Sequence, residues 1–102
     1  MQPMKYKSKI LSLARDELKE IRAYLSEFGS IPKNKIKESF FQYVKNASDN
    51  PYMYPEYEEN KKYRKAVIQY EYLVFFTVDE DNKMVKTERV LSSKRNVKSI
   101  LE

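Results

Sequence analysis

The chain has 102 residues, and its 20 Lys and Arg against 15 Asp and Glu give a formal net charge of +5. It contains no His, no Cys and a single Gly, which excludes His-dependent catalytic triads, thiolate nucleophiles, disulfides, zinc sites built on His or Cys, and Gly-rich phosphate loops. Any acid–base chemistry would therefore fall to Tyr, Lys, Arg, Asp or Glu.

The first two predicted elements are a strand and a helix. Lys5, Lys7 and Lys9 alternate with less polar residues between Met4 and Leu11, and this period of two predicts a strand with a solvated basic side. Ser12 is a candidate N-cap for the helix that follows. Gly29 predicts a left-handed residue that ends this helix. Apolar residues recur along the helix at intervals of four and three, at Ala14, Leu18, Ile21, Leu25 and Phe28.

A second helix is predicted from Ser30 onward. Pro32 lies where the first turn of a helix tolerates proline, and Asp49-Asn50-Pro51 stops the pattern. The link between the two helices is so short that they should form an antiparallel hairpin. The apolar stripe of the second helix consists of Ile36, Phe40, Tyr43, Val44 and Ala47.

The rest of the chain reads as a loop followed by three strands. Residues 50–60 carry two Pro, three Tyr and three Glu without a clear period, which indicates a loop or a short irregular segment. Residues 79–82 form a polar turn between the last two strands, and the tail from 92 to 102 either adds a short helix or stays loose. The predicted strands are Tyr63–Tyr70, Tyr72–Val78 and Met84–Leu91.

The predicted order is β-α-α-β-β-β, an α+β fold with an N-terminal strand, an α-helical hairpin and a three-stranded antiparallel meander. The length suits one domain over residues 1–102. The longest apolar run, residues 72–76, is far shorter than the ~20 residues of a membrane span, and residues 1–20 lack a signal-peptide core. We therefore expect a soluble, cytoplasmic protein, and the sequence indicates no metal and no cofactor.

Basic residues gather at two points of the predicted sheet, at the start of its second strand and after its last strand. If these points converge, they form one patch that suits phosphates or an acidic protein segment. A solvated, lysine-rich surface would account for the same residues. Arg89 lies in the last strand, in register with Val85 and Leu91, where it would face inward or toward a cleft. The candidate binding residues are Lys61, Lys62, Arg64, Arg89, Lys94, Arg95 and Lys98.

Tyr52, Tyr54 and Tyr57 come just before the first basic group. They could stack on bases beside a phosphate-binding groove. We favour the other interpretation, in which they cover a sheet edge with their hydroxyls facing water. The acidic runs at 56–59 and 79–81 lack the glycine and the spacing of a calcium loop, so we interpret them as a solvated loop and a hairpin turn.

Five segments, spread over nearly the whole chain, follow one another in a characteristic order. They are ARDELKEI at 14–21, NP at 50–51, YR at 63–64, YLVFFTVDE at 72–80 and ERVLSSKRNVKSIL at 88–101. In order and spacing these segments resemble the RelE/ParE toxins of bacterial type II toxin–antitoxin systems, and the last is similar to the ParE-type ending. The fold of that family is the one deduced above.

The resemblance implies a small cytoplasmic toxin that is held inactive by an antitoxin whose segment wraps over it. The family contains ribosome-dependent mRNA endonucleases and ParE-like poisons of DNA gyrase. In the nuclease branch, basic residues bind and polarise the scissile phosphate, and a Tyr or His near the C-terminus helps proton transfer. Arg89 matches the Arg of the ParE-type ending. On this pattern the candidate catalytic residues of a nuclease are Arg64, Lys65, Lys94 and Arg95.

The chain departs from the nuclease pattern in its C-terminal part. Ser92 stands where His is usual, and no Tyr or His follows Tyr72. The remaining residues can bind phosphate but lack the usual proton-transfer partner. We therefore favour ParE-like inhibition of DNA gyrase. The alternatives are a RelE-like, ribosome-dependent mRNA endoribonuclease and a non-toxic basic module that binds RNA or protein. A small sheet and hairpin also leave an apolar groove and a basic patch that an acidic, amphipathic antitoxin helix could cover.

Overall fold

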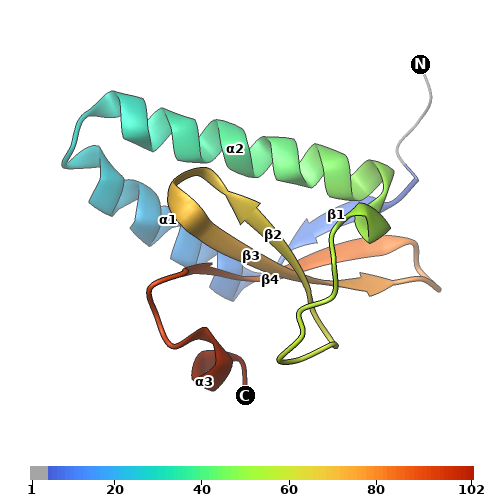
Figure 1. Cartoon of the computed structure of the whole chain (residues 1–102). Coiled ribbons are helices and arrows are strands. Elements are labelled where there is room, and N and C mark those ends of the chain that lie inside the picture. Colours follow the sequence, from blue (N-terminus) through green and yellow to red (C-terminus); the bar gives the residue numbers. More distant parts are fainter. Residues whose placement is uncertain (1–4) are drawn as a thin grey trace.

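The computed structural model describes residues 5–102, with two long helices on one face of a four-stranded sheet and a short C-terminal helix on the other (Figure 1). The strand order is β1-β4-β3-β2; β1 runs parallel to β4, and the other neighbours are antiparallel. The predicted α+β fold is confirmed. The elements are β1 (Lys7–Ile10), α1 (Ser12–Ser26), α2 (Ser30–Asp49), η1 (Pro51–Met53), β2 (Arg64–Ile68), η2 (Gln69–Glu71), β3 (Tyr72–Asp79), β4 (Met84–Ser92) and α3 (Val97–Leu101).

The ends of α1 differ from the prediction. Ser12 is the first residue of α1 rather than its N-cap, and Leu11, which precedes it, offers no capping side chain. After Ser26 the next three amides each bond to a carbonyl three residues back, at 3.0–3.2 Å. This tighter turn ends the helix. It carries Phe28, which was predicted on the buried stripe, to 64% exposure.

The remaining element boundaries follow the pattern with small shifts. Gly29 has the predicted positive φ, at 108°, but its ψ of 177° is extended rather than left-handed helical, and it directly precedes α2. Met4, the predicted start of the first strand, lies outside the described residues. β2 ends at Ile68 because Tyr70 and Glu71 turn the chain with φ near 60°. The tail forms α3 after a short link.

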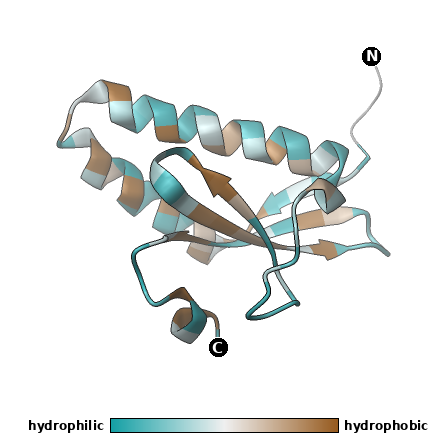
Figure 2. Ribbon diagram, in the orientation of Figure 1, coloured by the Kyte–Doolittle hydropathy of each residue, from teal (hydrophilic) through white to brown (hydrophobic). Residues whose placement is uncertain are grey.

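The larger core lies between the two long helices and the sheet. Ile36, Phe40 and Tyr43 of α2 pack with Phe76 of β3, and all four are at most 2% exposed. The Tyr43 hydroxyl lies 2.8 Å from the Thr87 Oγ1, and this bond satisfies both buried groups. Burial raises the pKa of Tyr43 far above its usual value, so its hydroxyl stays neutral. Apolar residues concentrate in the central strands and form stripes on α1 and α2 (Figure 2).

A β-bulge divides β4 between two cores. Phe76 pairs with Thr87 and Phe75 with Arg89, so Glu88 is an extra residue in β4. Val85, before the bulge, therefore packs in the helix-side core, whereas Leu91, after it, packs on the opposite face. The predicted common register of Val85, Arg89 and Leu91 is wrong for this reason. The second, smaller core contains Tyr63, Phe75, Leu91, Val97 and Leu101, and α3 supplies the last two.

Candidate functional site

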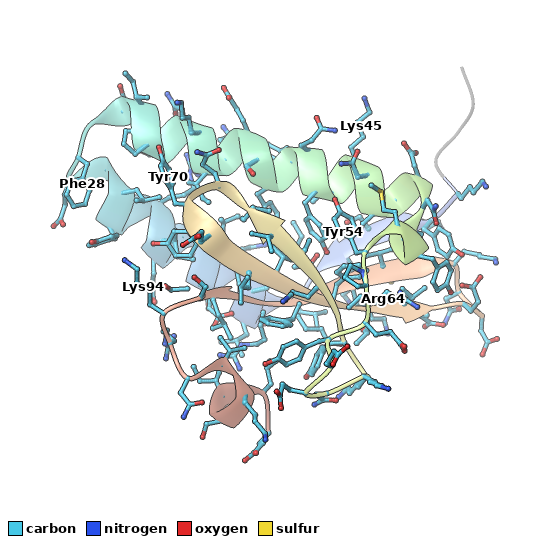
Figure 3. The ribbon with its side chains drawn as sticks, in the orientation of Figure 1. Phe28, Lys45, Tyr54, Arg64, Tyr70 and Lys94 are labelled. Atoms are coloured by element: carbon cyan, nitrogen blue, oxygen red, sulfur yellow. The ribbon has the colours of Figure 1, made fainter. Side chains whose placement is uncertain are left out.

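The start of β2, with Arg64, and the end of β4, which leads to Lys94, lie at opposite ends of the sheet (Figure 3). Arg64, at the start of β2, pairs with Phe76 of β3. Ile68, at the end of β2, pairs with Tyr72 at the start of β3, and Tyr72 also pairs with Ser92 at the end of β4. β2 and β4 therefore run in the same direction on either side of β3. As a result the start of β2 does not meet the end of β4, and the predicted convergence into one patch does not occur.

The first basic group is largely engaged with neighbouring tyrosines. The Arg64 guanidinium donates a hydrogen bond of 2.8 Å to the Tyr54 carbonyl and lies 4.8 Å from the centre of the Tyr52 ring. The Lys62 ammonium lies 5.3 Å from the Tyr63 ring centre. Lys65 lies over Tyr57 at 5.7 Å, and Lys61 is exposed. Arg64 thus anchors the segment after α2, in addition to any role toward a ligand.

In the second group, Lys94 and Arg95 are exposed in the link between β4 and α3. Lys98 belongs to α3, and its ammonium lies 3.4 Å from the Glu59 carboxylate. Because α3 packs on the sheet face opposite the long helices, Lys98 lies beside the segment that carries Glu59 and Lys61, so this one member of the second group approaches the first. The seven candidate binding residues therefore do not form one surface.

Arg89 forms an ion pair that sequence reasoning did not find. Its Nε lies 3.1 Å from both oxygens of Glu17, and its Nη2 lies 2.7 Å from Oε2. The Glu17 Oε1 also accepts a 3.0 Å hydrogen bond from the Val90 amide, because the pairing of β4 with β1 ends at Thr87. The hydrogen bonds to Glu17 raise the pKa of Arg89. Arg89 therefore fastens α1 to the edge of β4. The only available signal in the sequence was the position of Glu17 on the flank of the apolar stripe of α1.

The three tyrosines between α2 and β2 have different roles. Tyr54 packs against Tyr43 and Phe76, with ring centres 5.9 and 5.8 Å apart. Tyr57 packs on Phe75 at 5.0 Å on the opposite face of the sheet. Two of the three rings thus cover the sheet, but they pack on its two faces rather than on its edge as the favoured interpretation had it, and Tyr52, 49% exposed, stays largely open.

Glu80, in the turn between β3 and β4, links this turn to the segments that carry Tyr6 and Tyr52. It accepts hydrogen bonds from the hydroxyls of Tyr6 and Tyr52 and pairs with Lys83, and the two Tyr6 distances are 3.0 and 2.9 Å. These partners, Lys83 first, lower the pKa of Glu80 from 4.5 to about 2. The same contact raises the pKa of Tyr52 to about 12. The predicted hairpin turn is confirmed by a 3.1 Å bond from the Asn82 amide to Asp79.

The lowered pKa of Glu80 predicts a loss of stability in acid. A carboxylate whose pKa is lower in the folded state than in the unfolded state stabilises the fold at pH values above its unfolded-state pKa. For Glu80 this contribution disappears as the pH falls from 4.5 to about 2. Between these values the midpoint of thermal unfolding should fall less steeply in Glu80→Gln than in the parent chain. Circular dichroism melts across this range measure the difference. Glu58→Gln, at an exposed position in the loop, is the control and should follow the parent chain.

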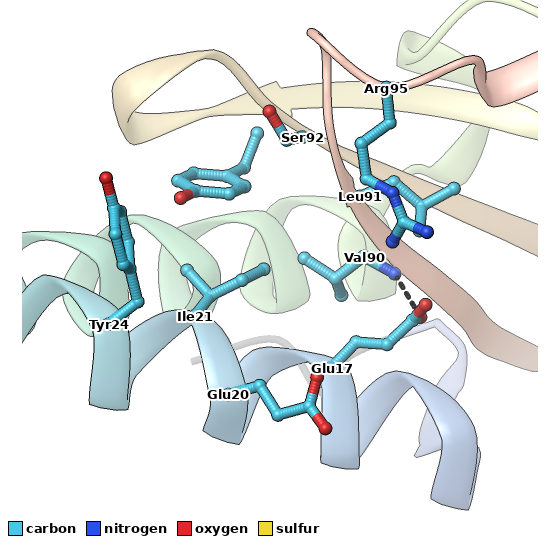
Figure 4. Close-up of a pocket in the computed structure, with 9 residues that line it drawn as sticks. Glu17, Glu20, Ile21, Tyr24, Val90, Leu91, Ser92 and Arg95 are labelled. Atoms are coloured by element: carbon cyan, nitrogen blue, oxygen red, sulfur yellow. Dashed lines mark hydrogen bonds between the residues drawn. The ribbon is translucent and has the colours of Figure 1, made fainter.

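A groove runs between α1 and the end of β4. Its first part, a hollow of about 230 Å³, lies where Glu17 and Ile21 of α1 face Val90, and Arg95 borders it (Figure 4). Its second part, of about 480 Å³, continues toward the α1–α2 link. Tyr24, Tyr72 and Ser92 line both parts, so the two hollows adjoin. The second part is otherwise lined by Leu25, Phe28, Pro32, Tyr70, Ser93 and Lys94.

Residues 5–102 contain neither a cluster of metal ligands nor a membrane-spanning helix. No group of three or more acidic residues is placed to hold a metal ion. None of the helices in this part of the chain is long and apolar enough to cross a membrane.

Comparison with known proteins agrees with the fold and the order of segments. The sequence profile of a family described as "ParE toxin of type II toxin–antitoxin system, parDE" matches residues 9–97. Among solved structures, a chain from the chromosomal ParDE toxin–antitoxin system of P. aeruginosa has the same fold, with a TM-score of 0.72 and 15% identity over 86% of this chain and 96% of that chain. No curated protein matches the sequence. Because the profile covers most of its length, the chain belongs to the ParE toxin family of type II toxin–antitoxin systems.

Proposed function

We propose that the chain is a cytoplasmic toxin that inhibits DNA gyrase and is neutralised by a cognate antitoxin. Family membership supports the toxin and its antitoxin partner. The main support for gyrase over mRNA is the separation of Arg64 and Lys65 from Lys94 and Arg95, which lie at opposite ends of the sheet. Cleavage of a phosphodiester requires cations and proton-transfer groups around the same reacting atoms, within about 3 Å of them. These four residues do not meet that condition.

The tyrosines support the same preference. Burial raises the pKa of Tyr43 and Tyr72, and the hydrogen bond to Glu80 raises that of Tyr52. A general base near neutral pH needs a pKa close to that pH, so each of these shifts goes in the wrong direction. Ser92 stands at a position where His is common in the family, and its hydroxyl cannot act as a general base with a pKa near neutral pH.

Expression of the chain alone in a bacterium, from a tightly controlled promoter, tests the proposal. We expect growth arrest, together with loss of supercoiling by purified gyrase when the purified chain is added, and intact mRNA by primer extension. Co-expression of the antitoxin should restore growth. Arg95→Ala serves as the nuclease test because its side chain has no ion pair among the described residues whose loss would disturb the fold.

Two results would contradict the proposal in different ways. Ribosome-dependent mRNA cleavage that disappears in Arg95→Ala would assign the chain to the endoribonuclease branch. Absence of any growth effect, from a chain shown to be folded, would instead indicate a non-toxic binding module.

A further inference from the structure

The flanks of α1 and α2 that face each other carry basic side chains. Arg15 of α1, Val44 of α2 and Lys9 of β1 line one hollow of about 550 Å³, so the two flanks meet there. Residues seven apart lie two turns along the same side of a helix. Arg22 therefore shares the flank of Arg15. Lys37 and the lysine one turn before it share the flank of Val44. The hairpin seam, as we call this surface, carries five cations: Lys9, Arg15, Arg22, Lys33 and Lys37.

Within residues 5–102, no carboxylate neutralises the hairpin seam. None of its five cations forms an ion pair there, and the Arg22 Nε is buried without a hydrogen-bond partner. Glu17 and Glu20 project from the other flank of α1, toward the end of β4. Glu27 lies in the link after α1. At about 100° per residue, the remaining carboxylates of the two helices lie about a third of a turn or more from the seam, and they are Asp16, Glu38 and Asp49.

The hairpin seam is long enough to follow a strand of DNA. α1 and α2 lie side by side along it (Figure 1). At 1.5 Å per residue, Lys33 and Val44 are separated by about 16 Å along α2. One strand of B-DNA places a phosphate at every 3.4 Å or so of the helix axis, so the seam spans about five phosphates. Ser8 and Ser12 line the hollow at its β1 end, and serine hydroxyls commonly bond to phosphate oxygens.

The side chains of the seam suit phosphates better than a protein partner. The apolar lining of its hollow consists of Ile10 and Val44. The exposed Phe41 ring, beside the seam, lies 5.9 Å from the Lys37 ammonium. Protein interfaces are anchored by clusters of aromatic side chains, whereas phosphate backbones are bound mainly by Lys, Arg and hydroxyl groups. Clustered aromatic rings of the hairpin and its neighbours lie instead at the other flank of α1, at Tyr24, Phe28 and Tyr70.

We propose that the hairpin seam binds the phosphate backbone of duplex DNA, and that the chain uses it to hold the DNA segment on which gyrase acts. The inference rests on the proposed inhibition of gyrase, because duplex DNA is the substrate of that enzyme. Contacts of this kind give affinity without sequence preference. They assign the α1–α2 hairpin a role that is separate from the groove at the end of β4.

A double variant, Arg15→Gln with Lys37→Gln, tests the seam. Both side chains are exposed, so the fold should be retained, and circular dichroism melts check this. Fluorescence anisotropy of a short labelled DNA duplex should give a dissociation constant about tenfold higher than that of the parent chain. The slope of log affinity against log salt concentration should become shallower by about two, because each phosphate contact contributes about 0.9.

Two further double variants serve as matched controls. Lys35→Gln with Lys86→Gln removes the same amount of charge elsewhere. Lys35 lies about half a turn around α2 from Lys37, and Lys86 pairs with Asp79 in the sheet. This control should change the dissociation constant by less than about threefold. Arg15→Lys with Lys37→Arg keeps both charges and should bind the duplex like the parent chain.

Three results would overturn DNA binding by the seam. They are absence of duplex binding by the parent chain at low salt, equal losses of affinity in the two charge-removing variants, and tighter binding of the parent to an RNA duplex of the same sequence. Equal losses would mean that net charge alone accounts for binding.

A supercoiling assay with purified gyrase tests the role of this contact in inhibition. The seam variant should require about tenfold more protein than the parent for half-maximal inhibition. Inhibition equal to that of the parent would contradict this role. A failure of the proposed function is recognised separately, because the parent chain would then leave gyrase active while its DNA affinity, measured without gyrase, still falls in the seam variant.

Discussion

Replacing Phe76 with alanine is expected to lower the free energy of unfolding by about 3–5 kcal/mol. Phe76 is fully buried in the middle of β3 and packs between the helices and the sheet. Its ring centre lies 5.5 Å from that of Tyr43 and 5.8 Å from that of Tyr54, so its loss opens a cavity next to both. Since domains of this size are stable by about 5–15 kcal/mol, this loss is a large part of the total free energy of unfolding.

Urea denaturation followed by circular dichroism measures this loss. Phe41→Ala is the control, because Phe41 is 57% exposed on α2 and its removal should change the free energy of unfolding by less than about 0.5 kcal/mol. A loss below about 1 kcal/mol in Phe76→Ala would mean that this core is not packed as described.

Replacing Glu17 with alanine is expected to destabilise the fold by about 2–3 kcal/mol. The substitution removes the partner of the Arg89 guanidinium and the acceptor of the Val90 amide at once. The two charged side chains are 12% and 21% exposed, so water compensates only partly for the lost contacts. Glu17→Gln should cost less, because an amide oxygen can still accept from Val90 while the charge is lost.

Hydrogen exchange gives a local reading of the same contact. The Val90 amide should exchange faster in Glu17→Ala than in Arg89→Ala, because only the first variant removes its acceptor. Glu20→Ala, one turn further along α1, is the control and should leave Val90 protected. Equal protection of Val90 in all three variants would show that another group protects this amide.

The sequence predicted the elements well because burial imposes a period on them. Ile36, Phe40, Tyr43 and Ala47 are all buried as the stripe of the second helix required. The position of the basic residues could also have been predicted. Short connections make β2, β3 and β4 a meander, and in a meander the first and third strands run in the same direction. The start of β2 and the end of β4 must therefore lie apart.

Other features depend on contacts that no single segment reveals. The bulge at Glu88 is defined by how β4 pairs with β3, so the alternation within β4 alone placed Arg89 beside Val85. The pair between Glu17 and Arg89 depends on where α1 crosses the edge of β4. The exposure of Phe28 depends on the tighter turn after Ser26. The bulge and the ion pair depend on contacts between elements, whereas Phe28 leaves the apolar stripe because the local turn after Ser26 ends the helical period.

The bulge in β4 also determines how this strand can change length during evolution. Deleting Glu88 alone would restore regular alternation, and the residues on one side of position 88 would then exchange faces relative to those on the other. Val85 and Leu91 could no longer each reach the core in which they now pack. An insertion or deletion in β4 therefore requires a compensating one nearby. When relatives of this chain are aligned, we expect a gap in β4 near position 88 to be accompanied by a second, compensating gap nearby.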